Sequence, residues 1–203
     1  MKFNRIMALA KKNKRIDIIN SVNGQWLSIG GAVYYIGNTG LNEQNIKPLF
    51  NMGADWCIRS TDIKDIKIIN FNDIDDWEEP ATVSDITILF DDEYFTTLTG
   101  KDTLNTILIN EDYLKPLSDE PTQYFIRTDN NLKYLAVKRG LILIAVILPH
   151  YLDEDFKKAF DLTNKSMSRL NKNYNKELKK AAEELGLDWT DDEDMEEIKE
   201  IKE

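Results

Sequence analysis

The segment 110–152 carries the clearest structural pattern of the chain. It begins with NEDYLKPL (110–117) and continues, after a polar break, with YFIR (124–127), LKYLAV (132–137) and LILIAVIL (141–148). The first run has the composition of a short helical turn. The other three are rich in β-branched, aromatic and aliphatic residues, which favour strands. We therefore expect a short helix followed by a C-terminal block of three antiparallel strands, which closes a body spanning 1–152.

The N-terminal part of the chain repeats this order of elements. Apolar residues at helical spacing predict a helix over 2–13. Three short β-prone runs follow at 16–19, 25–29 and 32–36, separated by Asn23-Gly24 and Gly30-Gly31. Such pairs favour tight hairpin turns, because the primed turns need positive φ. The pattern predicts an N-terminal three-stranded meander.

The middle of the chain alternates strand-like and acidic segments. We expect a short helix over 42–50, an edge strand at 56–58 and a strand at 66–71. The acidic stretch 72–80 is too charged to pack and predicts an exposed loop. Central hairpins follow, with strands at 85–90 and 93–98 joined across Asp91-Asp92, and a further strand at 106–109. The fold class is α+β with antiparallel sheets, and 1–70 and 85–152 are candidate sub-modules.

A long amphipathic helix is expected over 153–186, followed by an acidic tail at 187–203. Its apolar side chains recur at steps of three or four, as a core or oligomer face requires. We interpret them as a candidate partner or self-association face: Phe156, Phe160, Met167, Leu170, Tyr174 and Leu178.

Composition indicates a soluble, cytoplasmic protein. The chain has 203 residues, of which 42% are hydrophobic and 31% charged. Its longest apolar run, 141–148, is too short to span a bilayer, so no membrane association is expected. The N-terminus lacks the apolar core of a signal peptide, and the single cysteine, Cys57, cannot form an internal disulfide.

Charge is segregated along the chain, although the net charge is −10. Residues 1–15 carry six basic side chains and no acid, whereas 16–155 carry ten basic and twenty-three acidic ones. Residues 156–180 are again basic and 181–203 strongly acidic. This asymmetry bears on partners more than on fold. The candidate nucleic-acid contacts are Lys2, Arg5, Lys11, Lys12, Lys14 and Arg15. The alternative is that these side chains are solvated or pair with the acidic body.

No catalytic residue, cofactor site or metal site is predicted. His150 is the only histidine, and no Ser, Asp or Cys partner stands at a recognisable spacing from it. Cys57 is a poor candidate nucleophile, because no motif joins it to His150. The carboxylates of 73–76 and 91–93 are oxygen donors suited to Mg²⁺ or Ca²⁺. However, 73–79 lacks the glycine and the closing glutamate of an EF-hand loop, so solvated loops are the preferred interpretation.

The runs INEDYLKPL (109–117) and LIAVILP (143–149), with the strands between them, resemble the closing portion of a DNA polymerase sliding-clamp module. In such modules a short helix with a Tyr-Leu pair precedes antiparallel strands that end in an apolar run and a proline. The N-terminal helix, three strands and second helix are similar to the beginning of a clamp module. This resemblance implies an acidic ring protein that encircles DNA through basic helices, with the helix 2–15 on the inner surface. The composition also resembles that of bacteriophage and prophage proteins.

Two functional hypotheses from different classes follow. The first is a non-catalytic binding protein, DNA-associated and clamp-like, with a protein partner or self-association and with nucleic acid as a candidate ligand. The second is an acidic protein–protein interaction or inhibitor module, encoded by a phage or mobile element and directed at a host or phage protein. An enzyme is the least favoured class, because no nucleophile motif, metal-ligand spacing or phosphate loop is present.

Overall fold

The computed structural model describes residues 2–101, 106–118 and 121–151, together with the helical residues Ser166, 169–170, 173–177, 179–181 and Glu184. The chain divides into two compact units, Met1–Tyr151 and Leu152–Glu203. Most of the long helix expected over 153–186 lies outside the described residues, and so do Phe156, Phe160, Met167 and Leu178. Leu170 and Tyr174 are helical and exposed. One continuous long helix is therefore not supported.

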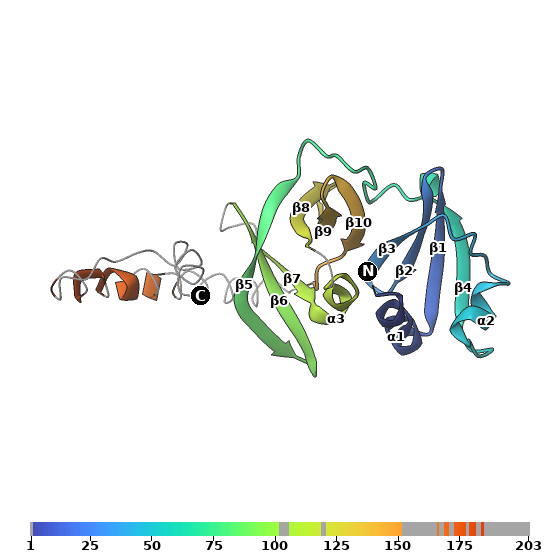
Figure 1. Ribbon diagram of the computed structural model, residues 1–203, viewed down its shortest axis with the longest axis horizontal. Helices are drawn as coiled ribbons and strands as arrows, with labels where there is room; N and C mark the ends of the chain where they lie inside the picture. The colour runs from blue at the N-terminus through green and yellow to red at the C-terminus, as the bar shows by residue number, and fades with distance from the viewer. Residues whose placement is uncertain are drawn as a thin grey trace, which may run out of the picture. The chain divides into compact units, whose positions relative to one another are not determined.

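The first unit is mixed α+β and consists mostly of strands (Figure 1). Its helical elements are α1 (Phe3–Asn13), α2 (Ile46–Phe50), η1 (Ile63–Asp65), α3 (Glu111–Leu114) and η2 (Lys115–Leu117). Its first strands are β1 (Arg15–Ser21), β2 (Gly24–Ile29), β3 (Ala32–Gly37), β4 (Cys57–Asp62) and β5 (Glu79–Phe90). The others are β6 (Glu93–Gly100), β7 (Thr106–Asn110), β8 (Gln123–Asp129), β9 (Leu132–Arg139) and β10 (Ile142–Ile147).

All ten strands form one sheet, in the order β4-β1-β2-β3-β10-β9-β8-β5-β6-β7. Separate antiparallel sheets were the wrong expectation, because β3 and β10 pair antiparallel through Tyr34 and Ala145 and join the two halves. Around this junction the order β1-β2-β3-β10-β9-β8 is palindromic. In each half a helix, α1 or α3 with η2, precedes three antiparallel strands. Among the described strands, β4 alone, an edge strand as expected, pairs parallel to its neighbour, β1.

The expected turns and helix boundaries are largely confirmed. Helix α1 ends where Lys14 adopts a left-handed conformation with φ 51°. Gly30, also left-handed with φ 60°, turns β2 into β3. Asp91 and Asp92 both have positive φ, which suits the right-handed twist of the hairpin that they close. That hairpin begins earlier than expected, because β5 starts at Glu79 and not at Asp85.

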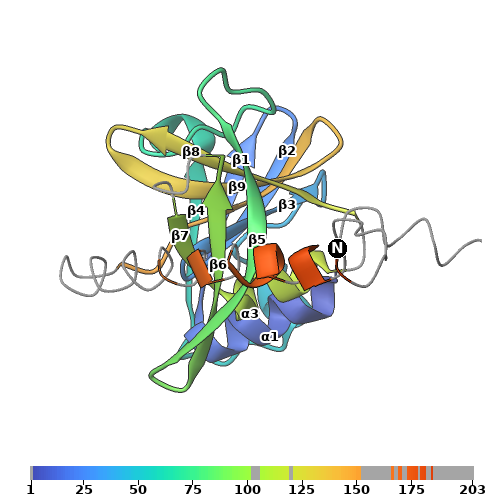
Figure 2. The same cartoon turned by 90° about the vertical axis from the view of Figure 1, so that its left-hand side faces the viewer.

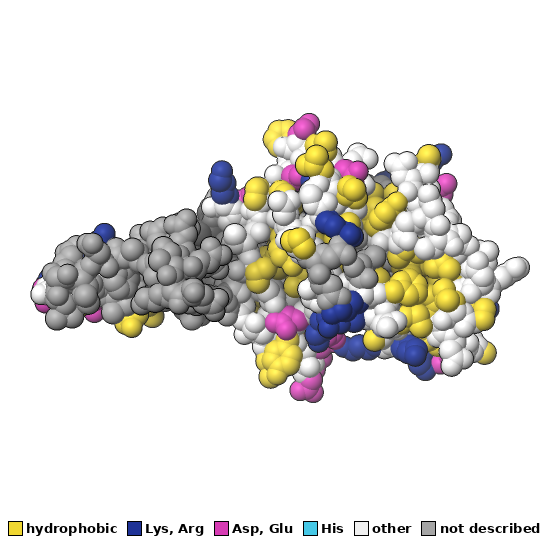
Figure 3. All heavy atoms as spheres, in the orientation of Figure 1, with side chains coloured by type: hydrophobic (Ala, Val, Ile, Leu, Met, Phe, Trp, Pro, Cys, Tyr) yellow, Lys and Arg dark blue, Asp and Glu magenta, His cyan; other side chains and the backbone are white. Residues whose placement is uncertain are grey.

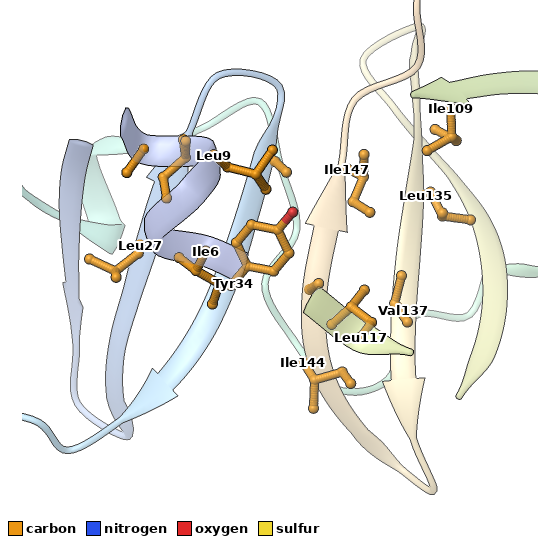
Figure 4. Packing of buried hydrophobic residues seen from close by; sticks show 14 of the residues in the cluster. Ile6, Leu9, Leu27, Tyr34, Ile109, Leu117, Leu135, Val137, Ile144 and Ile147 are labelled. Atoms are coloured by element: carbon orange, nitrogen blue, oxygen red, sulfur yellow. The ribbon is translucent and has the colours of Figure 1, made fainter. Parts of the chain in front are cut away.

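Successive side chains of each strand point to opposite faces of the sheet, and apolar clusters are buried on both faces. On one face, α1 and η2 cover a large apolar cluster. Figure 4 shows Ile6 and Leu9 of α1 with Leu27 and Tyr34 in one half, and Leu117 with Val137 in the other. Each such side chain contributes about 1.5–3 kcal/mol when fully buried. The palindromic halves thus share one core under the two helices.

The segment 63–78 covers the second face, where Ile63, Ile66, Ile69 and Phe71 pack against a cluster that includes Trp26 and Tyr134. One expectation is corrected here. Residues 66–71 form no strand, because Ile66, Ile69 and Phe71 pack onto the sheet and their backbone does not join its ladder. The acidic stretch 72–80 is a mostly exposed loop, as expected, until β5 begins at Glu79, and Arg127 of β8 binds it through the Asn72 carbonyl and the Glu78 carboxylate.

Candidate nucleic-acid interface

The two helices that begin the palindromic halves lie side by side on one face of the sheet (Figures 1 and 2). The Lys2 N–H donates to the Pro116 carbonyl at 2.8 Å. The Arg5 guanidinium donates to the Lys115 carbonyl at 2.7 Å and to the Ser118 hydroxyl at 2.9 Å. Backbone and side-chain bonds therefore fix the N-terminal half of α1 against η2.

Tyr113 fixes α3 against β3 and the β2–β3 turn. The Tyr34 hydroxyl donates to the Tyr113 carbonyl at 2.8 Å, and the Gly31 N–H donates to the Tyr113 hydroxyl at 3.2 Å. Burial raises the pKa of Tyr34 well above its ordinary value, so this hydroxyl stays protonated and able to donate. Tyr113 thus connects the predicted short helix to β3 and to the β2–β3 turn.

A groove of about 470 Å³ runs between the two helices, and we call it the α1–α3 groove. Its lining residues are Arg5, Ala8, Leu9, Lys12, Asp112 and Lys115. Figure 3 shows Lys and Arg side chains gathered where α1 and α3 lie. The groove therefore offers three cations and one carboxylate around a small apolar floor.

Ion pairs hold the cations near the groove. The Lys12 ammonium lies 2.5 Å from a Glu93 carboxylate oxygen and 3.5 Å from one of Asp112. The hydrogen bond to Glu93 raises the pKa of Lys12. Lys115 lies 2.6 Å from Asp112, and this hydrogen bond lowers the pKa of the Asp112 carboxyl. The raised pKa keeps Lys12 charged at neutral pH.

The other predicted cations are distributed around the ends of α1. Lys14 pairs with Asp55 at 2.6 Å, and Arg15 pairs with Asp17 at 2.9 Å. Lys11 lies on the exposed side of α1 and has no ion pair within the described part of the chain. Arg5 and Lys12 are thus the predicted contacts that line the groove.

Lys115 could not be singled out from the sequence, because it belongs to η2 and not to the basic segment 1–15. Its place beside Arg5 and Lys12 depends on the antiparallel return of the second half next to the first. The only available signal was the shared Lys-Pro-Leu of 47–49 and 115–117, and that run alone does not place two helices together.

The other candidate groups have internal structural partners. The imidazole of His150 lies against the Phe95 ring, with 4.6 Å between the ring centroids. The backbone N–H of His150 donates to the Leu108 carbonyl. Cys57 is exposed on the edge strand β4. Asp73 accepts the Leu143 N–H at 2.8 Å, and Asp75 accepts from Asn70 and from the Trp77 N–H.

Within the part of the chain that the structure describes, no group of three or more His, Cys, Asp or Glu side chains could hold a metal ion. No helix of these residues is long and apolar enough to cross a membrane.

Comparison with known proteins was made at the level of family models, curated proteins and solved structures. No protein-family model, curated protein or solved structure matches this chain.

Proposed function

We propose that this protein is a non-catalytic, nucleic-acid-associated binding protein of the sliding-clamp kind, and that the α1–α3 groove faces the phosphate backbone. The carrying observation is that α1 and η2 lie side by side on one face of a palindromic sheet and bring Arg5, Lys12 and Lys115 to one groove. Such a groove suits a polyanion that is recognised by charge and not by sequence.

The palindromic strand order supports the clamp resemblance. A module built from two equivalent halves presents two equivalent helices on the same face, and a duplex has a repeating backbone for them to follow. The second half contains the run 109–117 on which the resemblance rests, and the first half contains the basic helix α1. The pairing of β3 with β10 sets the two helices beside each other.

The ion pairs in and around the groove do not prevent phosphate binding. Lys12, Lys14, Arg15 and Lys115 each remain more than half exposed while paired. Exposed pairs of this kind are worth only about 0–1 kcal/mol, so a phosphate oxygen can replace the carboxylate at little cost. The proposed binding is therefore weak and strongly dependent on salt.

No catalytic step belongs to this proposal. His150 packs against the rings of Phe90 and Phe95, and the Asp112 and Glu93 carboxylates serve as counter-charges for Lys12. The groove holds and positions a ligand without activating it.

The test is retention of double-stranded DNA by the whole chain at low and at moderate salt. We expect binding at low salt that weakens steeply as salt is raised. The variant Lys12→Glu/Lys115→Glu should lose it, whereas Lys64→Glu/Lys67→Glu, at exposed lysines of the segment that covers the other face of the sheet, should retain it. Absence of binding at both salt concentrations would refute the proposal.

A second candidate is an acidic protein-interaction module, and one observation favours it. The acidic loop that precedes β5 exposes two large apolar side chains, Ile74 and Trp77. Oligomeric state separates the candidates, because a ring of two or three copies favours the clamp and a monomer favours the interaction module.

A further inference from the structure

We infer that the loop tip Ile74–Trp77 is the docking site for a protein partner whose contacting segment combines basic side chains with an apolar one. This inference deepens the second candidate function by naming the chemistry of the partner. It is independent of nucleic-acid binding, because the loop belongs to the segment that covers the face of the sheet opposite α1.

The apolar part of this site is unusually exposed. Trp77 is 85% exposed and Ile74 is 70% exposed, although they lie only three residues apart. Neither side chain belongs to the two buried clusters of the described residues, so their apolar surface is open to a partner. Tryptophan is the residue type most enriched among the few side chains that dominate binding energy at protein interfaces. An exposed indole beside an exposed isoleucine therefore indicates a contact with another molecule.

The loop tip is held rigidly from both sides. Before it, Arg127 donates to the Asn70 and Asn72 carbonyls at 3.1 and 2.8 Å. After it, the same guanidinium binds the Glu78 carboxylate at 2.7 Å. Within the tip, the Trp77 N–H donates to Asp75 at 2.9 Å. A partner therefore meets a loop that is already ordered, which reduces the entropic cost of binding.

Charge selects the class of partner. Beside Trp77 lies a cavity of about 390 Å³ between the loop and the end of β8. It is lined by Asn70, Asn72, Ile74, Asp75, Asp76, Trp77, Thr128 and Asp129, so that every charged side chain in the lining is acidic. Such a cavity attracts a lysine or arginine and repels a phosphate or a carboxylate. The adjacent indole face adds a cation–π contact to the same side chain.

The two properties together define the occupant. A cationic side chain fits the cavity, and an aliphatic or aromatic neighbour covers Ile74 and Trp77. A basic, partly apolar peptide segment meets both requirements, whereas nucleic acid and acidic peptides place negative charge against the acidic lining of the cavity. A second copy of this chain, presenting its own basic helix α1, is the competing occupant that the experiment must separate.

The experiment measures binding of a fluorescently labelled peptide with a Lys-Leu-Arg repeat to the whole chain by anisotropy. We expect Trp77→Ala to weaken binding by about tenfold or more, as removal of a central interface tryptophan does. Asp76→Asn/Asp129→Asn should weaken it about three- to tenfold at low salt and less at high salt. Tyr151→Ala is the matched control, because Tyr151 is an aromatic residue of equal exposure, 85%, elsewhere on the unit.

Three outcomes overturn the inference. The first is equal peptide binding by the parent chain and Trp77→Ala. The second is equal or tighter binding of a Glu-Leu-Glu peptide, which would remove the charge argument. The third is self-association of the parent chain in sedimentation that Trp77→Ala abolishes, which would make a second copy the occupant. DNA retention by Trp77→Ala is measured alongside, so that failure of the groove and failure of the loop tip remain distinguishable.

Discussion

Replacement of Arg127 by methionine should destabilise the protein more than any comparable change of a charged residue on its surface. Arg127 is 1% exposed, and all three of its guanidinium nitrogens donate hydrogen bonds within the protein. It binds Glu78 through Nε at 3.0 Å and through a terminal nitrogen at 2.7 Å. It also donates to the carbonyls of Asn70, Asn72 and Asp73. These contacts hold the segment 63–78 on the sheet.

The expected loss of unfolding free energy follows from the polar groups that Arg127→Met leaves without a partner. Methionine fills much of the volume but donates no hydrogen bond, so three carbonyls and part of the Glu78 carboxylate lose their partner. Breaking a buried ion pair from one side costs about 3–5 kcal/mol. Glu78 still contacts Lys138, and the Asn72 and Asp73 residues are exposed enough for water to reach them. We therefore expect the low end of that range, about 3 kcal/mol.

Urea unfolding followed by circular dichroism measures this loss. With a slope of about 1–3 kcal/mol per molar urea, a loss of about 3 kcal/mol lowers the midpoint by about 1–3 M. Arg59→Met, on the exposed edge strand β4, is the control and should change stability by less than about 0.5 kcal/mol. In Arg127→Met/Glu78→Gln the two losses should fall short of additivity, because the residues form one network. A loss below about 1 kcal/mol for Arg127→Met would refute the view that this residue anchors the segment.

Three further predictions concern the junction, the pH dependence and the groove. Ala145→Leu, at the fully buried β3–β10 junction, should cost about 1–3 kcal/mol in thermal unfolding, whereas exposed Leu141→Ala should cost almost nothing. Burial raises the pKa of Tyr34 and of Tyr134 above the ordinary 10.0. The stability that these two protonated hydroxyls contribute is therefore complete below about pH 10 and is lost as the pH rises through their folded-state pKa values. A urea midpoint that stays constant from about pH 9 to 11.5 would contradict this. Glu93→Gln removes a counter-charge from Lys12 and should tighten DNA binding about two- to fivefold at low salt; a weaker complex would argue that Glu93 positions Lys12 for its ligand.

Local pattern was sufficient to predict most of the strands. The turns at Gly30 and at Asp91-Asp92 are encoded by residues that accept positive φ, and the amphipathic period of 3–13 is evident in the sequence. The extent of the sheet was not predictable in this way. The pairing of Tyr34 with Ala145 joins strands more than a hundred residues apart, and no local propensity specifies such a partner.

For the same reason, only the groove residues that α1 contributes were predicted from the sequence. Basic residues of α1 could be read from composition, but Lys115 becomes part of the groove through the long-range return of the chain. The acidic stretch 72–80 was correctly expected to be an exposed loop, but its anchor was not predicted, because that anchor is a single arginine, Arg127, in the short run 124–127. An arginine in a run such as YFIR (124–127) is the signal that a buried charge network would leave in the sequence.

Nucleic-acid binding through the α1–α3 groove is tested most directly by the salt dependence of DNA affinity. A duplex held by about three phosphate contacts should give a plot of log affinity against log salt with a slope near −2.7. Lys12→Glu/Lys115→Glu should abolish measurable binding, and Lys64→Glu/Lys67→Glu should leave the slope unchanged. A slope near zero, or equal affinity for the parent chain and the groove variant, would contradict the proposed function.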